Sequence, residues 1–600
     1  MEFTRTFDFL DNLTLICPEK SDMLVAREKK TWIPYSVKDY LKNAYNISYG
    51  LMALGLKKGD RIVSISNNRP EWNFLDMGMA QAGIIHVPIY PTISIEDYEY
   101  ILNHVEPSFV FVSDKQLHDK ISSIARKIAS VKDIYSFNTI DGVRNWQEIT
   151  RLGQENEERF RDQLAKLKGE ITSEDPTTFI YTSGTTGNPK GVMLSHRNIL
   201  SNVESISRVF NFNTTHRTLS FLPISHVFER TINYYFQRIG VSIYYAENIG
   251  TIAENLREVK PHVFISVPRL LEKTYDKILA KGRELSGIKK LIFFWAVNVG
   301  MHYKVPSGNG WLYKMKLKIA DKLVFTKWRE ALGGRVEIIV TGGAALQPRL
   351  AIVFNAAGIP VAEGYGMTEA SPVIATNRPP VTGEIRVGTV GPAVPGVEIR
   401  IAEDGEILCR GENVMCGYYK EPDLTREVID KDGWLHTGDI GILVEGKYLK
   451  ITDRKKEIFK LSSGKYIAPQ LIENKLKESD FIEQVMVIGE NQKFASALIS
   501  PDFQFLHKWA SIHNVDFRDN KELISDPRVI ARYQRVVTEM NRQLGVTDQI
   551  KRFRLVQEEW TPDTGELSPT LKLKRKFLTK EYEDIINEIF SIQKNGEDGD

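Results

Sequence analysis

The chain has 600 residues, more than a single hydrophobic core usually supports, so we expect two or more domains. Its composition, with 42% hydrophobic and 26% charged residues, is that of an ordinary globular protein. The formal net charge of +2 is close to neutral and does not indicate a nucleic acid as the main partner. Three cysteines match no zinc-binding spacing and are expected to be thiols in a reducing compartment: Cys17, Cys409 and Cys416.

The first part of the chain alternates helical and strand patterns. After a helix that ends near 53–56, the pattern predicts a strand over 61–66, a helix over 72–82 and a strand over 84–89. The same alternation returns later, with strands predicted over 263–266, 336–341 and 359–363. This rhythm predicts layered α/β structure with parallel strands, whose carboxyl ends are the usual place for a ligand.

A loop rich in glycine and hydroxyl groups follows the apolar strand predicted at 178–180. Residues 181–191 read Tyr-Thr-Ser-Gly-Thr-Thr-Gly-Asn-Pro-Lys-Gly. Glycines let backbone N–H groups turn toward an anion, the hydroxyls add donors, and Lys190 adds a positive charge. The P-loop spacing is not met, because Pro189 stands where its second glycine would fall. The composition therefore predicts a polyphosphate loop of another kind, with a polar strand-to-helix turn of no function as the alternative.

A basic and aromatic region covers residues 285–330 and includes the longest apolar run, 291–300. This run has about half of the roughly 20 residues that a membrane span needs. The N-terminus also lacks the basic-then-apolar order of a signal peptide. We therefore expect a cytoplasmic chain. Its basic region either lies peripherally on the inner face of an anionic membrane or forms ordinary amphipathic helices with solvated lysines.

The composition and pattern of the sequence change twice after about residue 388. From about residue 388 short strands and Gly/Pro turns predict a β-rich subdomain, 388–452. A charged linker, 453–456, then follows a strand predicted over 448–451. We place the main boundary there, which gives a large domain over 1–452 and a small C-terminal domain over 453–600. The predicted fold class is α/β, with layered α/β subdomains and a β-rich subdomain in the large domain and α+β structure in the small one.

Four further segments combine turn residues with groups that bind nucleotides. They are the glycine turn at 342–345, the Glu-Gly-Tyr-Gly-Met-Thr-Glu run at 363–369, the Trp-Leu-His-Thr-Gly-Asp run at 434–439 and a basic strip at 566–575. Each alone is also compatible with ordinary turn chemistry or a solvated charged face.

Together with the loop at 181–191, and in this order, these segments resemble the AMP-forming acyl-CoA synthetases of the adenylate-forming superfamily. The resemblance extends from about Gly55 to Arg575. Three stretches are similar to the long-chain fatty-acid branch, namely 222–230, 432–439 and 453–461. The resemblance implies ATP-dependent activation of a long-chain fatty acid to an acyl-adenylate. It further implies transfer to CoA, which gives acyl-CoA, AMP and pyrophosphate.

The resemblance also implies roles for residues of the large domain. No protein nucleophile is needed, so alignment and charge neutralisation carry the reaction. Thr368 would bind the α-phosphate, and Glu369 with Thr185 would hold Mg²⁺, a hard cation that prefers oxygen ligands. The β- and γ-phosphates would be held by Thr182, Ser183, Gly184, Thr185, Thr186, Gly187 and Lys190. The rest of the ATP site would be formed by Gly343, Ala344, Ala345, Glu363, Gly364, Tyr365, Gly366 and Met367, with Tyr365 stacked on adenine.

In the C-terminal part, the resemblance gives the ribose to Asp439 and Arg454, and the bridge between the reacting carboxylate and the α-phosphate to Lys572. A register shifted by two residues would give this role to Lys574, which together with Arg575 is otherwise expected to be a surface charge or a contact for CoA phosphates. The small domain would swing between the two half-reactions about a hinge. The hinge and the CoA tunnel would involve Lys456 and Gly464, while Gln470 replaces a glutamate frequent in relatives and Glu473 is retained.

Three histidines and one arginine lie near these segments, and only His226 has two interpretations. His226 lies in an apolar stretch, where it is either a core residue or a group beside the acyl carboxylate that takes part in catalysis. His196 and His436 are expected to be structural. Arg269 is expected to make only a salt bridge.

Three rival functions remain. A ligase could pass the acyl group to the phosphopantetheine of a carrier protein instead of CoA. A non-enzymatic fatty-acid or nucleotide-binding protein is less compatible with the joint presence of Lys190, Glu369, Asp439 and Lys572. A membrane-surface scaffold built on 285–330 would bind lipid independently of ATP.

Overall fold

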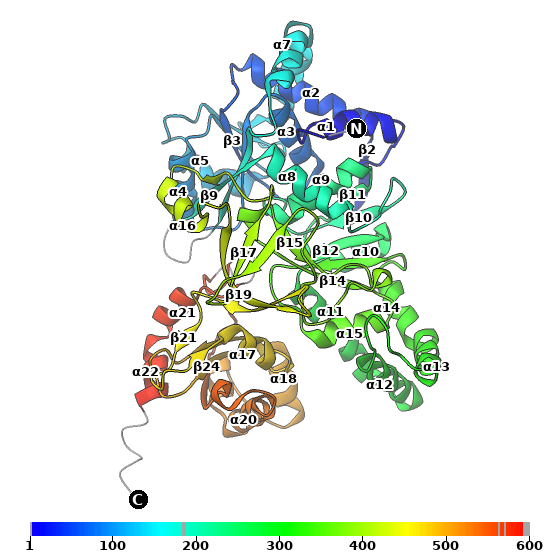
Figure 1. Cartoon of the computed structure of the whole chain (residues 1–600), viewed down its shortest axis with the longest axis vertical. Coiled ribbons are helices and arrows are strands. Elements are labelled where there is room, and N and C mark those ends of the chain that lie inside the picture. Colours follow the sequence, from blue (N-terminus) through cyan, green and yellow to red (C-terminus); the bar gives the residue numbers. More distant parts are fainter. Residues whose placement is uncertain (1–2, 183–187, 562–563, 569–571, 592–600) are drawn as a thin grey trace, which may run out of the picture. The chain divides into compact units, whose positions relative to one another are not determined.

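The computed structural model describes residues 3–182, 188–561, 564–568 and 572–591 (Figure 1). These residues form two compact units. The first unit comprises Met1–Arg400, Leu408–Thr437 and Val444–Leu449, and the second comprises Ile401–Ile407, Gly438–Leu443 and Lys450–Asp600. Among the predicted site residues, Ser183, Gly184, Thr185, Thr186 and Gly187 lie outside the described residues.

One eight-stranded sheet of the first unit carries the predicted phosphate loop. Its strand order is β18-β9-β8-β4-β3-β5-β6-β7. The strands are β3 (Arg61–Ile65), β4 (Ile85–Ile89), β5 (Phe109–Val112), β6 (Asp133–Ser136), β7 (Arg144–Asn145), β8 (Pro176–Thr182), β9 (Lys190–Ser195) and β18 (Gly417–Tyr418). The pairs from β8 to β7 are parallel, which confirms the predicted alternation, whereas β9 and β18 are antiparallel additions.

Helices connect the parallel strands of this sheet. The helix predicted over 72–82 is α3 (Pro70–Gln81), and it begins two residues early because Pro70 fits the first turn, where no N–H partner is needed. All of its residues are buried, so it shows little amphipathic pattern. The other helices of this part are α1 (Asp8–Ile16), α2 (Val37–Ala53), α4 (Ile95–Val105), α5 (Lys115–Ala125), α6 (Trp146–Glu155), α7 (Glu157–Glu170) and α8 (His196–Ser207).

The second eight-stranded sheet has the order β15-β14-β13-β12-β10-β11-β1-β2. Its strands are β1 (Leu24–Glu28), β2 (Thr31–Tyr35), β10 (Arg217–Ser220), β11 (Ser242–Tyr245), β12 (Val263–Ser266), β13 (Ile338–Thr341), β14 (Val361–Gly366) and β15 (Val373–Thr376). The strand predicted over 263–266 is therefore confirmed. The two predicted over 336–341 and 359–363 begin two residues later than expected, and Pro360, which has no N–H to pair, stands just before β14.

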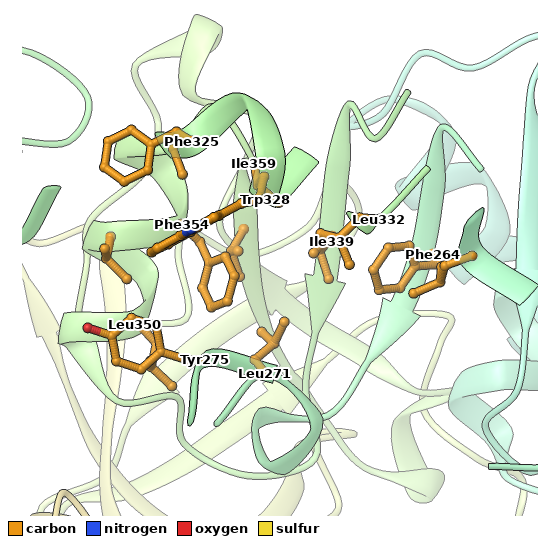
Figure 2. Close-up of a cluster of buried hydrophobic side chains, with 14 of the residues drawn as sticks. Phe264, Leu271, Tyr275, Phe325, Trp328, Leu332, Ile339, Leu350, Phe354 and Ile359 are labelled. Atoms are coloured by element: carbon orange, nitrogen blue, oxygen red, sulfur yellow. The ribbon is translucent and has the colours of Figure 1, made fainter. Parts of the chain in front are cut away.

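A large apolar cluster packs beside this sheet (Figure 2). Phe264 and Ile339 come from the strands, while Leu271 and Phe354 come from helices and are buried with them. The helices of this part are α9 (Val227–Ile239), α10 (Ile252–Val259), α11 (Pro268–Glu284), α12 (Gly287–Met301), α13 (Trp311–Ala320), a π-helical turn (Asp321–Phe325), α14 (Thr326–Ala331) and α15 (Pro348–Ala356).

Residues 285–330 form helices whose outer faces remain apolar. On α13 and the turn that follows, Trp311, Met315, Ile319 and Leu323 recur every four residues, and all are more than 40% exposed. The inner face of α13 packs through Tyr313, whose hydroxyl donates to the Val299 carbonyl of α12 at 2.6 Å. Within the described ranges no helix combines the length and the apolar character needed to cross a membrane.

Short strands and turns follow residue 388, as predicted. They form a four-stranded sheet in the order β16-β17-β19-β20, with β16 (Glu398–Ile401), β17 (Glu406–Arg410), β19 (Leu435–Val444) and β20 (Tyr448–Arg454). The helix α16 (Pro422–Val428) precedes β19 in the chain. The last strand runs through Arg454, so the prediction that it ends at Ile451 is wrong. Backbone pairing continues into the charged segment, where the Lys455 N–H donates to the Gly438 carbonyl at 2.9 Å.

The C-terminal segment is α+β, as expected. A three-stranded sheet comprises β23 (Ile482–Ile488), β24 (Ser496–Pro501) and β25 (Arg552–Leu555), and a short pair comprises β21 (Phe459–Lys460) and β22 (Tyr466–Ile467). Its helices are α17 (Pro469–Leu476), α18 (Phe503–Ile512), α19 (Asn520–Ser525), α20 (Pro527–Asn541), α21 (Arg575–Glu581) and α22 (Glu583–Ser591). Apolar side chains of β23, β24, α17 and α20 form a core of their own.

Candidate functional site

The predicted phosphate loop connects two paired strands. β8 and β9 are antiparallel neighbours, and Thr182 is paired with Lys190 at the end of the hairpin from which the loop leaves. The loop therefore leads from strand to strand, and the strand-to-helix geometry of the alternative interpretation is wrong. Pairing of the stems brings the ends of the loop together, and it fixes Lys190 relative to β8, which in turn pairs with the parallel strand β4.

Lys190 and Glu369 are linked through Tyr418, which the sequence reasoning missed. The Lys190 Nζ lies 5.0 Å from the centre of the Tyr418 ring. The Tyr418 hydroxyl donates to Glu369 Oε1 at 2.9 Å. No motif in the sequence indicated this tyrosine, because its short strand joins the sheet only as an edge addition beside β9.

Thr368 and Glu369 begin a short 3-10 turn (Thr368–Ala370) directly after β14. The chain folds back sharply there, and the Met367 N–H donates to the Pro372 carbonyl at 3.1 Å. Gly366 permits this turn, since a Cβ at its position would lie 1.9 Å from the Pro372 oxygen. Thr368 is buried, while Glu369 is half-buried.

The segments 342–345 and 363–365 lie together at the ends of β13 and β14. The Leu346 N–H donates to Glu363 Oε1 at 2.8 Å, which ties the glycine turn to the neighbouring strand. Glu363 is buried, and this burial raises the pKa of its carboxyl to about 8. Gly343 adopts φ +84, a left-handed conformation that favours glycine. Beside the buried Tyr365, the structure leaves Gly343, Ala344 and Ala345 exposed.

His226 is the N-cap of α9. Its Nδ1 accepts the Phe228 N–H at 3.1 Å, so a neutral ring carries its proton on Nε2. The side chain is half-buried and lies near Tyr90, with 6.2 Å between the ring centres. It is therefore not a fully buried core residue.

A buried charge network one turn along α9 was also missed. Arg230 donates to Asp76 Oδ1 at 2.5 Å and to Thr178 Oγ1 of β8 at 2.5 Å. Burial alone would raise the pKa of Asp76, but Arg230 and its other partners lower it below the usual range. His86 contacts the same carboxylate at 2.6 Å, and burial lowers the pKa of this histidine to about 4. The network attaches α9 to the strand that leads into the phosphate loop.

In the second unit, Asp439 and Arg454, which the resemblance assigns to the ribose, form an ion pair. Their side chains are 3.5 Å apart between Nε and Oδ1. The next residue, Lys455, is held by Asp404 at 2.6 Å and by Glu406 at 2.8 Å. Lys456 and Gly464 are both exposed.

The basic strip at 566–575 divides into exposed and paired charges. Lys572 and Lys574 are exposed, and the backbone of Lys572 pairs with Ser568. Arg575 is not a surface charge as expected: its side chain is only 19% exposed. It binds Glu457 at 2.9 Å and Glu473 at 2.6 Å, because α21 begins at this residue beside α17 and β23.

Asp453, the first residue of the predicted hinge, is buried. It accepts the N–H groups of Arg454 at 2.6 Å and of Gln470 at 3.1 Å. Burial raises the pKa of its carboxyl to about 7 against these hydrogen bonds, and Glu457 and Glu473 add to the rise.

The groups expected to be structural are placed accordingly. His196 is buried, and its Nδ1 contacts the Thr6 N–H at 3.2 Å. Arg269 makes the salt bridge to Glu272 at 3.0 Å, and His436 lies 3.9 Å from Asp430. In the part of the chain that the structure describes, no group of three or more His, Cys, Asp or Glu side chains could hold a metal ion. A magnesium ion bound together with phosphates needs only one or two carboxylates, so Glu369 fits that kind of site.

Comparison with known proteins matches both parts of the chain. The profile of the family described as AMP-binding enzyme matches residues 18–419, and that of the AMP-binding enzyme C-terminal domain matches residues 456–594. The chain is 33% identical over 550 residues to the long-chain-fatty-acid–CoA ligase FadD15 of Mycobacterium bovis, and the match covers 90% of each chain. It is 32% identical over 594 residues to human long-chain-fatty-acid–CoA ligase 1, covering 94% of this chain and 83% of the relative.

Solved structures share the fold at lower identity. The adenylation domain of a carboxylate reductase from Mycobacterium chelonae has a TM-score of 0.75 at 20% identity and covers 98% of this chain and 91% of that one. The adenylation domain of a carboxylic acid reductase from Segniliparus rugosus, in complex with AMP and a carboxylic acid, has a TM-score of 0.73 at 19% identity, with 98% and 94% covered. The predicted fold class is therefore confirmed.

Proposed function

Because the chain belongs to the family of AMP-binding enzymes, we propose that it is a long-chain acyl-CoA synthetase, which uses ATP to join a long-chain fatty acid to CoA. The observation that carries this proposal is identity of about a third, over nine-tenths of the chain, to long-chain-fatty-acid–CoA ligases. Transfer to a carrier protein is not favoured, because the relatives named above are CoA ligases.

The first half-reaction forms a mixed anhydride. A fatty-acid carboxylate oxygen attacks the α-phosphorus of ATP, and the bond to the β-phosphate oxygen breaks, which releases pyrophosphate. The charge of the phosphates must be neutralised while the two reactants are held in line. Lys190 and the loop that begins at Thr182 would bind the β- and γ-phosphates, and Thr368 would donate to the α-phosphate. The second half-reaction forms a thioester when the CoA thiolate attacks the acyl carbonyl and AMP leaves.

Glu369 would hold Mg²⁺ through its carboxylate, together with Thr185. When bound, this ion neutralises phosphate charge and polarises the phosphoryl oxygens. The hydrogen bond from Tyr418 occupies one acceptor position of the Glu369 carboxylate, which has about four.

The adenine would lie beside Tyr365 and the turn at 343–345. Glu363 supports this pocket through Leu346, and its raised pKa keeps most of the carboxyl neutral at pH 7. His226 would lie beside the acyl carboxylate, where a neutral ring can donate from Nε2.

The C-terminal residues would complete both steps. Asp439 and Arg454 would hold the ribose, and Lys572 would bridge the carboxylate and the α-phosphate. A boundary between domains at 452 and 453 with a hinge at 453–456, including Lys456, would let the small domain exchange Lys572 for the CoA tunnel beside Gly464. We also propose peripheral attachment to the inner face of a membrane through α13, whose exposed apolar stripe is flanked by Lys314, Lys316 and Lys318.

The experiment that tests the function measures pyrophosphate, AMP and thioester with ATP and palmitate, with and without CoA. Turnover that needs CoA, with palmitoyl-CoA as product, is the expected result. A single release of pyrophosphate that ignores CoA would instead support transfer to a carrier. Absence of release with fatty acids of several chain lengths would contradict the proposed substrate class.

A further inference from the structure

We propose that Tyr418 is a positioning residue of the ATP site, which holds the Glu369 carboxylate and the Lys190 ammonium in place for magnesium and phosphate. The inference rests on the proposed function of these two charged groups. Tyr418 contacts both of them: its hydroxyl donates to Glu369 Oε1 at 2.9 Å, and the centre of its ring lies 5.0 Å from Lys190 Nζ. No sequence motif and no role implied by the resemblance had included it.

The backbone around Tyr418 is fixed on both sides. Tyr418 pairs with Val192 of β9, and the flanking Cys416 and Tyr419 N–H groups donate to the Met193 and Gly191 carbonyls at 3.0 and 2.8 Å. These bonds attach the segment to the strand that begins with Lys190.

The same segment is also attached to the residue that would hold magnesium. The Met415 N–H donates to the Glu369 carbonyl at 2.9 Å. The Tyr418 N–H donates to Thr425 Oγ1 at 2.9 Å, and the side chain is buried. Residues 415–419 therefore connect the phosphate-loop hairpin and the 3-10 turn of Glu369, and Tyr418 is the side chain that reaches the charged groups of both.

The chemistry of a tyrosine suits this position. An ammonium and a carboxylate in one site attract each other, and a direct ion pair would withdraw both from ATP and the metal. The ring face attracts the Lys190 ammonium, and the hydroxyl donates to one oxygen of the Glu369 carboxylate. Each charged group is thus held by Tyr418 and can still bind its own ligand, phosphate for the ammonium and magnesium for the carboxylate. A phenol is protonated at neutral pH, so the Tyr418 hydroxyl donates to the carboxylate there.

The two contacts can be separated by substitution. Tyr418→Phe keeps the ring and removes the hydroxyl, so we expect the magnesium concentration for half-maximal rate to rise about tenfold, as for loss of a hydrogen bond to a charged group. The KM for the fatty acid should stay the same. Tyr418→Leu also removes the ring, so ATP binding should weaken even without magnesium. Tyr419→Phe is the matched control, since its ring stacks on Phe179 at 4.6 Å and is not part of the proposed site.

Titration calorimetry of ATP, with and without MgCl₂, provides a readout that is independent of turnover. In Tyr418→Phe we expect unchanged affinity without magnesium and loss of most of the gain that magnesium gives to the wild-type protein. Equal magnesium gains in Tyr418→Phe and wild type, with both melting at the same temperature, would overturn the inference. If the wild-type protein binds Mg-ATP but forms no acyl-adenylate, the proposed function fails while the role of Tyr418 is still tested by the same titration.

Discussion

Arg575 donates from one guanidinium nitrogen, Nη2, to both carboxylate oxygens of Glu473, at 2.8 and 2.6 Å. The same guanidinium binds Glu457 through Nε, so one cation at the start of α21 is shared by two acids of the C-terminal unit. Lys572 lies three residues before it. The ion pairs therefore anchor the chain next to the lysine to which we assign the first half-reaction.

Arg575→Met should loosen this anchor. Removal of one partner from a largely buried ion pair costs about 3 kcal/mol of stability, because two carboxylates lose their cation. Hydrogen exchange of the full chain should show faster opening of α21 and α17 in Arg575→Met. The control variant Lys574→Met, which changes an exposed neighbouring residue, should show the same exchange of these helices as wild type. Equal protection of α21 in Arg575→Met and wild type would show that the pairs add no stability.

Lys572→Ala should separate the two half-reactions. Loss of a cation that stabilises the developing charge lowers a rate by about 100-fold to 1,000-fold. Pyrophosphate release from ATP and fatty acid should therefore nearly disappear, while thioester formation from supplied acyl-adenylate and CoA should be largely intact. Lys574→Ala is the matched control, because Lys574 is also an exposed lysine of the same strip. If Lys574→Ala loses adenylate formation instead, the shifted register is right.

Glu363→Gln should be tolerated. The pKa of this buried carboxyl is about 8, so most of it is neutral at pH 7, and an amide oxygen can accept the Leu346 N–H as well. The KM for ATP should change by less than about threefold, whereas Glu363→Ala leaves a buried N–H unpaired and should raise it about tenfold. Above pH 8 the wild-type carboxyl ionises in a buried site. ATP binding by the wild type should then weaken relative to Glu363→Gln, and parallel pH profiles would contradict this.

Asp453 should make stability depend on pH. Its pKa is about 7 in the folded chain, against about 4 for an unperturbed carboxyl. Between these values the folded state binds more protons than the unfolded state, so the free energy of unfolding falls as pH rises through this range. The contribution is fully present below pH 4 and is lost as pH passes 7. The midpoint of thermal unfolding should fall less steeply from about pH 5 to about pH 8 in Asp453→Asn than in wild type. The test compares only how steeply the midpoint changes with pH in the two proteins. Their absolute midpoints also differ, because the amide of Asp453→Asn can keep only part of the hydrogen bonds that the Asp453 carboxyl makes.

A negative charge introduced on the outer face of α13 should reduce lipid binding. Wild-type protein should sediment with vesicles that contain phosphatidylglycerol and much less with pure phosphatidylcholine, because lysines flank the apolar stripe. Met315→Glu and Ile319→Glu should lower the bound fraction several-fold, since each places a carboxylate in the interface. Ile512→Glu is the control, because Ile512 is an isolated exposed apolar residue on α18. Equal sedimentation of all variants would contradict attachment through α13.

Local patterns predicted the parallel strands, since short apolar runs such as 263–266 end at breaks that the sequence displays directly. They also placed Glu363 at the end of a predicted strand and Lys190 in the loop after another, whereas β14 continues to Gly366 and Lys190 begins β9. The contacts of Tyr418 and Arg230 were not predictable in this way. Tyr418 meets Glu369 across 49 residues, and Arg230 meets Asp76 across 154, distances at which periodicity carries no information. The basic strip was recognised, but its composition could not show that acids 102 and 118 residues earlier pair with Arg575.

The β8–β9 hairpin holds Lys190 in place independently of the sequence of the phosphate loop. Because Thr182 and Lys190 are paired across the two strands, the position of the lysine depends on strand register and not on the residues between them. Substitutions between Thr182 and Lys190 should therefore change phosphate binding through the replaced groups themselves. They should not move Lys190, the cation that we propose to bind the β- and γ-phosphates.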